Sequence, residues 1–140
     1  MRIAVTGGSG FIGSALVPEL RGRGHQVELV PRGLIGDASV LSGCAVVVHL
    51  AAIAHIDARS ATVSRNYIDQ VNAKLPVSLL VAAQAAGVRR FIFLSSIKAV
   101  GEHTSPGHPI QIDSTPAPSS VYGTAKRDAE VALQKYATDI

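Results

Sequence analysis

The chain opens with "MRIAVTGGSGFIGSALV", residues 1–17, in which three glycines spaced by three follow a short apolar run. The glycines are Gly7, Gly10 and Gly13, and apolar residues resume directly behind them. This order predicts a strand over residues 2–6, a tight turn, and a helix that begins near Phe11. A strand that turns directly into a helix is the repeating unit of a parallel α/β sheet.

The glycine spacing predicts an anion site at this turn. The first glycine permits a tight bend, the second lets a pyrophosphate approach the main chain, and the third lets the helix lie against the strand. The free N–H groups and the dipole of the helix N-terminus then face phosphate. We therefore expect the turn to bind a dinucleotide, with a purely structural glycine turn as the alternative.

Length and composition limit the organisation of the chain. With 140 residues, 47% of them apolar, we expect one domain over residues 1–140. A net charge of +3 with few aromatic residues favours small anionic ligands over nucleic acid. A single cysteine, Cys44, and no metal-type Cys/His spacing predict no disulfide, no metal and a reducing, cytoplasmic setting. Neither a signal peptide nor a membrane segment is expected.

Strand and helix patterns alternate along the chain. This alternation predicts an α/β fold with a doubly wound parallel sheet and helices on both of its faces. The connection over residues 32–37 has room for neither a helix nor a further strand, so we expect that edge of the sheet to be short. The Gly- and Pro-containing stretch 101–118 predicts a loop. The expected strands are 2–6, 26–30, 45–50 and 90–95, and the expected helices are 11–23, 66–86 and 119–136.

Four motifs occur in the order found in extended short-chain dehydrogenases/reductases. They are "TGGSGFIG" at 6–13, "HLAA" at 49–52, "FLSS" at 93–96 and "YGTAK" at 122–126. The chain resembles the NAD-dependent epimerase/dehydratase family over essentially its whole length, which implies a Rossmann-type fold. The stretches "RFIFLSSIKAVGE" and "PAPSSVYGTAKRDAE" resemble the branch that acts on nucleotide sugars, including 4-epimerases and 4-keto-sugar reductases.

The resemblance covers the N-terminal part of this family. Its members continue with further strands and a smaller domain that grips the substrate. We therefore expect residues 1–140 to form the dinucleotide-binding domain with the substrate domain absent, and to show little turnover alone.

Three residues are candidates for catalysis. Tyr122 and Lys126 are four residues apart on an expected helix, so they share one face, and a nearby ammonium favours the phenolate that a general base requires. Ser96 follows the fourth strand, at the sheet edge where ligands bind in open α/β folds. The resemblance implies that Ser96 orients the substrate and that Tyr122 exchanges a proton while hydride moves to or from nicotinamide. A surface Tyr/Lys pair is the alternative interpretation.

Cofactor choice depends on the end of the second strand. An acidic residue there binds the ribose of NAD, whereas an arginine accommodates the 2′-phosphate of NADP. Pro31 and Arg32 stand at this point, which favours NADP over NAD. The resemblance implies that Asn72 lies near nicotinamide and Asp37 near adenine. The other expected cofactor contacts are Gly7, Gly10, Phe11, Ile12, Gly13, Ala38, Leu50, Ala51, Ala52, Tyr122 and Lys126.

Other features have structural interpretations. His49 lies in a core strand, where we expect a buried, hydrogen-bonded imidazole rather than a catalytic one. A helical stripe predicts core packing or a face of a homodimer. Its members are Leu75, Leu79, Leu80 and Ala83.

The sequence leaves three functions open. The first is the dinucleotide domain of a nucleotide-sugar epimerase, dehydratase or 4-keto-sugar reductase, in which Ser96, Tyr122 and Lys126 serve hydride transfer. The second is a dinucleotide-binding module without turnover. The third is a reductase of a non-sugar carbonyl compound.

Overall fold

The fold is seen in a computed structural model, which describes residues 1–54 and 64–137. The described residues contain one parallel sheet in the order β2-β1-β3-β4, so β1 is an interior strand. The strands are β1 (Arg2–Thr6), β2 (Gln26–Val30), β3 (Val46–His49) and β4 (Arg90–Phe93). The predicted parallel sheet is therefore confirmed, and its strands end up to two residues earlier than expected.

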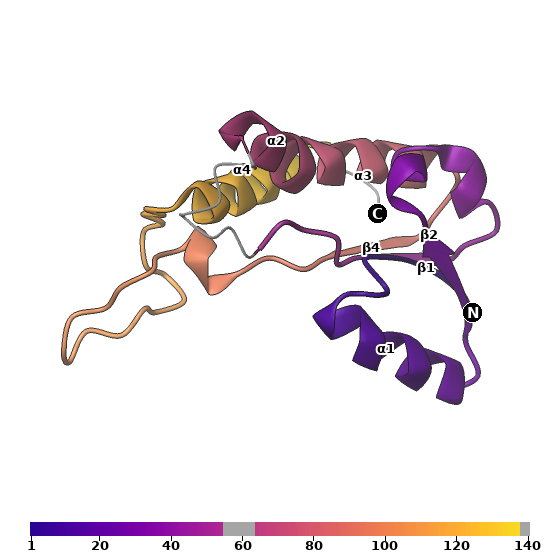
Figure 1. Cartoon of the computed structure of the whole chain (residues 1–140), viewed down its shortest axis with the longest axis horizontal. Coiled ribbons are helices and arrows are strands. Elements are labelled where there is room, and N and C mark those ends of the chain that lie inside the picture. Colours follow the sequence, from indigo (N-terminus) through magenta and orange to yellow (C-terminus); the bar gives the residue numbers. More distant parts are fainter. Residues whose placement is uncertain (55–63, 138–140) are drawn as a thin grey trace.

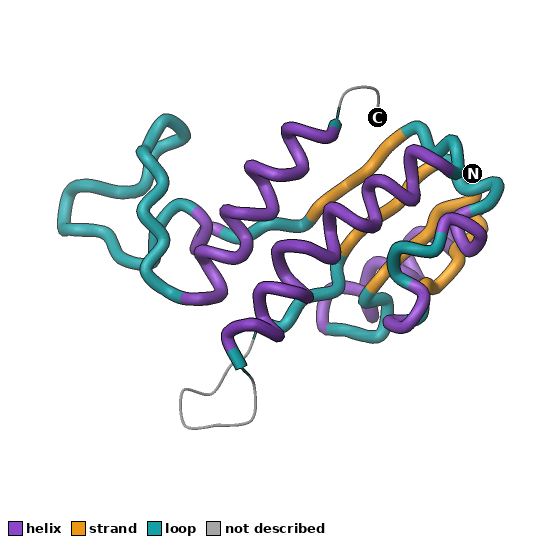
Figure 2. Tube along the Cα trace, turned by 90° about the horizontal axis from the view of Figure 1, so that it is seen from above, coloured by secondary structure: helices purple, strands orange, loops and turns teal. Residues whose placement is uncertain are grey.

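Helices cover both faces of the sheet. Helix α1 (Phe11–Gly22) lies on one face, and α2 (Arg65–Asp69), α3 (Leu75–Ala85) and α4 (Val121–Tyr136) lie on the other (Figure 1). Helices α3 and α4 run side by side (Figure 2). The doubly wound architecture expected from the sequence is present. None of the described helices is long and apolar enough to cross a bilayer.

Alternating residues of the strands fill two separate cores. Ala4 and Val47 point toward α3, whereas Val5 and Val48 point toward α1. Each side chain is at most 8% exposed. Burial on both faces explains why these strands are continuously apolar rather than alternating with polar residues. Leu79, Leu80 and Ala83 of the predicted helical stripe are also buried, so this part of the stripe is core.

The connection from β2 to β3 is as short as the sequence indicated. Two 3₁₀ turns, η1 (Arg32–Leu34) and η2 (Ala38–Leu41), make up most of this connection. Leu41 is fully buried and joins the core beside α3. The turns therefore close this edge of the core with few residues.

The expected helix over 66–86 is interrupted by a π-helical turn, η3 (Gln70–Lys74). Pro76 follows within the first turn of α3. A proline lacks an N–H and its ring clashes with the carbonyl four residues earlier, here that of Asn72. The wider π turn accommodates this proline and turns the Asn72 side chain inward, where it is 0% exposed.

The stretch 101–118 is a long loop that extends away from the sheet (Figures 1 and 2). At its base the Ala117 N–H donates to the Val100 carbonyl at 2.7 Å. The Glu102 carboxylate accepts from the hydroxyls of Ser119 and Ser120. These contacts bind the two ends of the loop to the start of α4.

Candidate functional site

Two adjoining pockets lie at the carboxyl edge of the sheet, on either side of the glycine turn. We call them the Arg32 pocket, of about 370 Å³, and the Tyr122 pocket, of about 630 Å³. Both volumes fall within the range of small-molecule sites. They share four lining residues, Gly7, Gly10, Leu50 and Ala52, so the two pockets form one continuous cleft.

The glycine turn is built so that side chains are excluded at two positions. Gly7 has φ +68°, and a Cβ there would lie 2.7 Å from the Ala51 nitrogen. A Cβ on Gly13 would collide with the Gly7 carbonyl and lie 2.5 Å from the Gly8 Cα. Gly7 therefore lets the turn pack on the end of β3, and Gly13 lets α1 pack on the turn.

The N-terminus of α1 offers unpaired backbone donors to the cleft. Its N-cap is Gly10, with no side-chain cap, and its first turn holds no acidic residue. The first N–H groups of a helix have no partner within the helix and carry partial positive charge. A Cβ on Gly10 would meet only the Gly7 carbonyl, at 3.2 Å, so the space beside it is open. This cradle fits a diphosphate.

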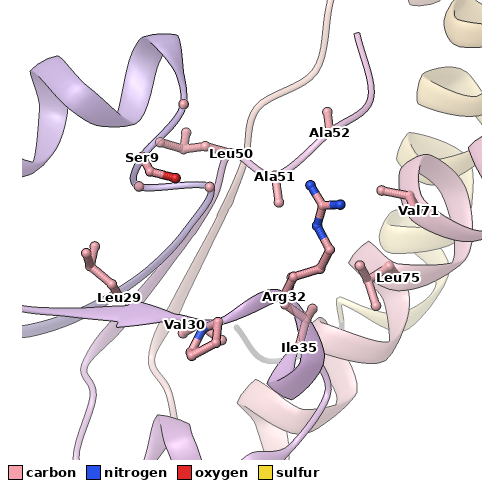
Figure 3. Close-up of a pocket in the computed structure, with 14 residues that line it drawn as sticks. Ser9, Leu29, Val30, Arg32, Ile35, Leu50, Ala51, Ala52, Val71 and Leu75 are labelled. Carbon is pink, nitrogen blue, oxygen red and sulfur yellow. The ribbon is translucent and has the colours of Figure 1, made fainter.

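The Arg32 pocket combines apolar walls with one cation. The Arg32 guanidinium extends into the pocket toward Ala51 and Ala52 (Figure 3). The apolar side chains around it include Leu29, Val30, Ile35, Val71 and Leu75. This arrangement suits a flat apolar ring system joined to an anionic group.

Asp37 and Ala38 are not among the residues that line either pocket. The Asp37 carboxylate accepts from the Ser39 N–H at 2.8 Å and so caps η2. These hydrogen bonds with Ser39 lower the pKa of Asp37. The structure thus gives Asp37 the role of a turn residue, and the expected adenine contact stays a prediction.

The Tyr122 pocket brings together the three candidate catalytic residues. Ser96, Tyr122 and Lys126 line it with the first residues of α1, Phe11 and Ile12. The Ser120 hydroxyl caps α4 by accepting from the Gly123 N–H at 3.0 Å, which starts the helix just before Tyr122. Tyr122 and Lys126 therefore face the cleft from successive turns.

Lys126 is buried to an unusual degree for a lysine, with 2% of its surface exposed. Its Nζ donates to the Leu94 carbonyl at 2.9 Å and lies 4.4 Å from the centre of the Phe93 ring. Burial lowers the pKa of Lys126 to about 8, and the nearby Glu130 carboxylate opposes that change. The ammonium is held at the end of β4, beside the cleft.

The two serines after β4 are used differently. The Ser96 hydroxyl accepts from the Lys98 N–H at 3.3 Å, so its own proton stays free to be donated into the cleft. The Ser95 hydroxyl donates to the Glu130 carboxylate at 2.5 Å. Of the two, Ser96 is the one able to donate to a substrate oxygen.

Asn72 supports the cleft from behind rather than lining it. Its Oδ1 accepts from the Ile53 N–H at 2.8 Å, and its Nδ2 donates to the Ile53 carbonyl at 2.9 Å. Ile53 itself lines the Tyr122 pocket. The buried amide therefore fixes the chain that leaves β3, while its expected contact with nicotinamide stays a prediction.

A second buried polar pair ties β1 to β3. The Thr6 Oγ1 and the His49 Nδ1 are 2.6 Å apart, and Thr6 Oγ1 also accepts from the Ala51 N–H at 3.2 Å. Burial, and next the charge of Lys126, lower the pKa of His49 to about 4, so the imidazole is neutral. His49 is buried as predicted, but its Nε2 has no partner among the described residues.

Sequence reasoning missed Thr6 and Glu130. Thr6 stands at the carboxyl end of an interior strand, a position where polar side chains meet ligands or brace the site. Glu130 follows Lys126 by four residues, which places both on one helix face. These two signals were available in the sequence. Residues 1–54 and 64–137 contain no cluster of His, Cys, Asp and Glu suited to a metal ion.

Comparison with known proteins gives the site its context. The model of the NAD dependent epimerase/dehydratase family matches residues 3–139. A UDP-glucose 4-epimerase of Vibrio cholerae is 36% identical over 159 aligned residues, which cover 98% of this chain and 47% of that protein. A 3-beta-hydroxysteroid dehydrogenase of Mycolicibacterium neoaurum is 36% identical over 71% of this chain and 33% of its own length.

Solved structures agree with these relatives. A short-chain dehydrogenase/reductase superfamily protein from Agrobacterium tumefaciens with bound NAD has a TM-score of 0.84 and 30% identity, over 99% of this chain and 46% of that one. MoeE5 in complex with UDP-glucose and NAD has a TM-score of 0.82 and 27% identity, over 99% and 50% of the two chains. The chain thus spans about half the length of the epimerase and of these two solved structures, and a third of the length of the 3-beta-hydroxysteroid dehydrogenase.

Proposed function

Because the chain belongs to the NAD-dependent epimerase/dehydratase family, we propose that its cleft binds a nicotinamide dinucleotide and serves hydride transfer on a nucleotide sugar. Ser96, Tyr122 and Lys126 are the proposed catalytic residues. The observation that carries the proposal is the continuity of the cleft, which runs from Arg32 past the bare helix N-terminus to the Ser/Tyr/Lys cluster.

The order of these features matches the order of groups in a dinucleotide. The apolar Arg32 pocket suits the adenosine end, the N-terminus of α1 suits the pyrophosphate, and the Tyr122 pocket suits the nicotinamide end. The contacts proposed at the turn are those of Gly7, Gly10, Phe11, Ile12 and Gly13. Leu50, Ala51 and Ala52 supply the opposite wall.

Each proposed catalytic residue has a distinct task. A bound nicotinamide supplies the acceptor or donor of hydride. Tyr122 takes the proton from the substrate hydroxyl as hydride leaves the same carbon, and returns it in the reverse direction. Ser96 donates a hydrogen bond to that substrate oxygen and orients it. Lys126 holds its ammonium beside the site, at the end of β4, one helical turn after Tyr122.

Arg32 supports a preference for NADP over NAD. Its guanidinium is the cation of the Arg32 pocket. Pro31 directly follows β2, at the position where an acidic residue would bind the ribose 2′-hydroxyl of NAD. A guanidinium pairs strongly with a phosphate, whereas a neutral 2′-hydroxyl gains less from it. The family is described as NAD-dependent. The proposed preference is therefore a difference in affinity, with NADP binding more tightly than NAD.

The relatives support a nucleotide sugar as substrate, since one is a UDP-glucose 4-epimerase and one solved neighbour holds UDP-glucose. The 3-beta-hydroxysteroid dehydrogenase supports a second candidate, a non-sugar alcohol or carbonyl. A binding module without turnover is the third. Epimerase and dehydratase chemistry begin with hydride transfer from the substrate to nicotinamide, and a reductase runs that transfer in reverse. This shared step, with the proton exchanged at Tyr122, is what we propose.

Calorimetric titration with NAD⁺ and NADP⁺ tests the binding step. We expect saturable binding of both, tighter for NADP⁺. Gly10→Val should weaken both together because its side chain fills the space beside the helix N-terminus. Gly22→Ala is the matched control, since a Cβ there meets nothing within 4 Å. Absence of saturable binding, or Gly10→Val binding like the unmodified chain, contradicts the proposal.

Absorbance at 340 nm then separates the two substrate classes. The NAD⁺- or NADP⁺-loaded chain is mixed in stoichiometric amount with UDP-glucose or with a 3β-hydroxysteroid. Reduction by the sugar nucleotide alone supports the proposed substrate class, and reduction by the steroid alone supports the second candidate. Dinucleotide binding without any reduction fits both the binding module and a domain that needs more of the chain to hold its substrate.

A further inference from the structure

Glu130 lies on α4 one turn after Lys126 and has no part in the chemistry described above. Both oxygens of its carboxylate accept hydrogen bonds. Oε1 accepts from the Ser95 hydroxyl at 2.5 Å, and Oε2 accepts from Arg127 Nη1 at 3.1 Å. Its side chain is 24% exposed, so this carboxylate is mostly withdrawn from water and fixed from two sides.

Ser95 lies between two residues that belong to the site. Leu94, the residue before it, accepts from Lys126 Nζ, and Ser96, the residue after it, is the proposed substrate-orienting hydroxyl. Helix α4 therefore makes hydrogen bonds with two consecutive residues after β4. Lys126 bonds to Leu94, and Glu130, one turn later, bonds to Ser95. Two bonds a turn apart fix both the height and the rotation of the helix relative to the strand end.

We propose that Glu130 is a positioning residue of the site, which fixes the end of β4 through Ser95 and keeps Lys126 charged and in place. The inference rests on the proposed function, because a positioning role presupposes that Lys126 and Ser96 act in the cleft. The charge relation supports the geometry: burial lowers the pKa of Lys126, and the Glu130 carboxylate raises it.

Other ionisable groups near Lys126 do not replace Glu130. Tyr122 flanks Lys126 on α4, and His49 faces it from β3 with a pKa lowered to about 4, so it is neutral at the pH of the test. The charged groups of the remaining elements packed against α4 are Lys98 of η4, Lys74 of η3, and Arg65 and Asp69 of α2. Lys98 pairs with Glu102, and Asp69 and Lys74 line a groove with Asp128 on the outer side of α4.

The proposal is tested by titrating Lys126 itself, with no dinucleotide present. The chain has four lysines, so ε-¹³C lysine labelling gives four NMR signals, and Lys126→Met identifies the one of interest. In Glu130→Gln we expect the midpoint of Lys126 to fall below that of the unmodified chain, near 8. Asp128→Asn is the matched control, since it removes the same charge from the exposed side of the same helix and should leave the midpoint unchanged.

An unchanged Lys126 midpoint in folded Glu130→Gln overturns the proposal, as does an equal fall in Asp128→Asn. Far-UV circular dichroism establishes folding. If Glu130→Gln does not fold, Glu130→Asp is used instead. The aspartate side chain is one methylene shorter, so its carboxylate no longer reaches Ser95 and lies farther from Lys126. A fall in its midpoint supports the proposal, and an unchanged midpoint overturns it. No ligand is added in this NMR titration, so its result does not depend on whether the chain binds a dinucleotide.

Discussion

Lys126 Nζ donates to the Leu94 carbonyl at 2.9 Å, which joins the middle of α4 to the carboxyl end of β4. Lys126 itself is buried, and the Phe93 ring covers the ammonium from one side. One side chain thus links the helix that carries Tyr122 to the strand end that carries Ser96. The cost of this arrangement is a buried charge, and several expectations depend on it.

Lys126→Met should stabilise the fold and weaken the site. Lowering the pKa of a lysine from 10.5 to about 8 means that the buried ammonium opposes folding at neutral pH, so its removal should raise the free energy of unfolding by about 3 kcal/mol. Between pH 8 and 10.5 the unfolded chain binds more protons than the folded one, so stability of the unmodified chain rises with pH there.

Urea unfolding at pH 7 and pH 9.5 measures both effects for Lys126→Met. Its pH dependence should be flatter than that of the unmodified chain, and its dinucleotide affinity should fall about tenfold or more. Lys135→Met, an exposed site on the same helix, is the control and should change neither. A variant that is less stable at pH 7 yet binds normally contradicts the assigned role of Lys126.

Arg32→Asp should exchange the cofactor preference. The new carboxylate repels a 2′-phosphate and can accept from a 2′-hydroxyl, so NADP⁺ affinity should fall about tenfold or more relative to NAD⁺. Calorimetry with both dinucleotides gives the ratio. Arg23→Asp, at the C-terminal end of α1, is the control and should leave the ratio of the two affinities unchanged. An unmodified chain that binds NAD⁺ at least as tightly as NADP⁺ shows that Arg32 is wrongly assigned.

Gly13→Ala should destabilise the domain itself. The added methyl group meets backbone atoms of Gly7 and Gly8, which cannot move without opening the turn, so the free energy of unfolding should fall by about 1–3 kcal/mol. Gly22→Ala on the same helix adds its methyl in open space and should be neutral or raise stability by up to about 1 kcal/mol. Equal stabilities of the two variants in urea contradict this account of the turn.

His49 should make the domain acid-sensitive. Its pKa is lowered from 6.5 to about 4 in the fold, so between these values the unfolded chain binds more protons and stability is lost as pH falls. From pH 7 to pH 5 this loss should be about 2 kcal/mol. His49→Phe removes the titration, so urea unfolding at both pH values should show a loss smaller by that amount. An equal loss in both proteins excludes the effect.

The sequence predicted the repeating units of the fold because they are local. The glycine turn, the apolar strands and the Tyr122/Lys126 spacing each lie within a few residues, and each fixes its own geometry. The short connection after Arg32 was predicted for the same reason, since a missing stretch of chain is visible by its length alone. The family resemblance then placed these units in one cleft.

What the sequence did not predict depends on contacts between distant segments. Pro76 indicates that the helix is disturbed near Asn72, but not that the Asn72 amide turns toward Ile53, 19 residues away. The role of Asp37 as a turn cap depends on whether η2 faces the Arg32 pocket, which is a matter of packing. Likewise, Glu130 gains its importance from Ser95, which is 35 residues distant.

In the proposed complex, the nicotinamide end of a bound dinucleotide lies against Ser96, Tyr122 and Lys126. Nuclear Overhauser effects in the isotope-labelled chain with NADP⁺ measure this directly. We predict contacts from the nicotinamide H4 to the Tyr122 ring and from the adenine protons to Leu75, and in Tyr122→Phe the affinity should stay within about twofold because the phenol acts on substrate. Adenine protons in contact with Tyr122, or nicotinamide protons in contact with Leu75, would show that the dinucleotide lies the other way round and contradict the account.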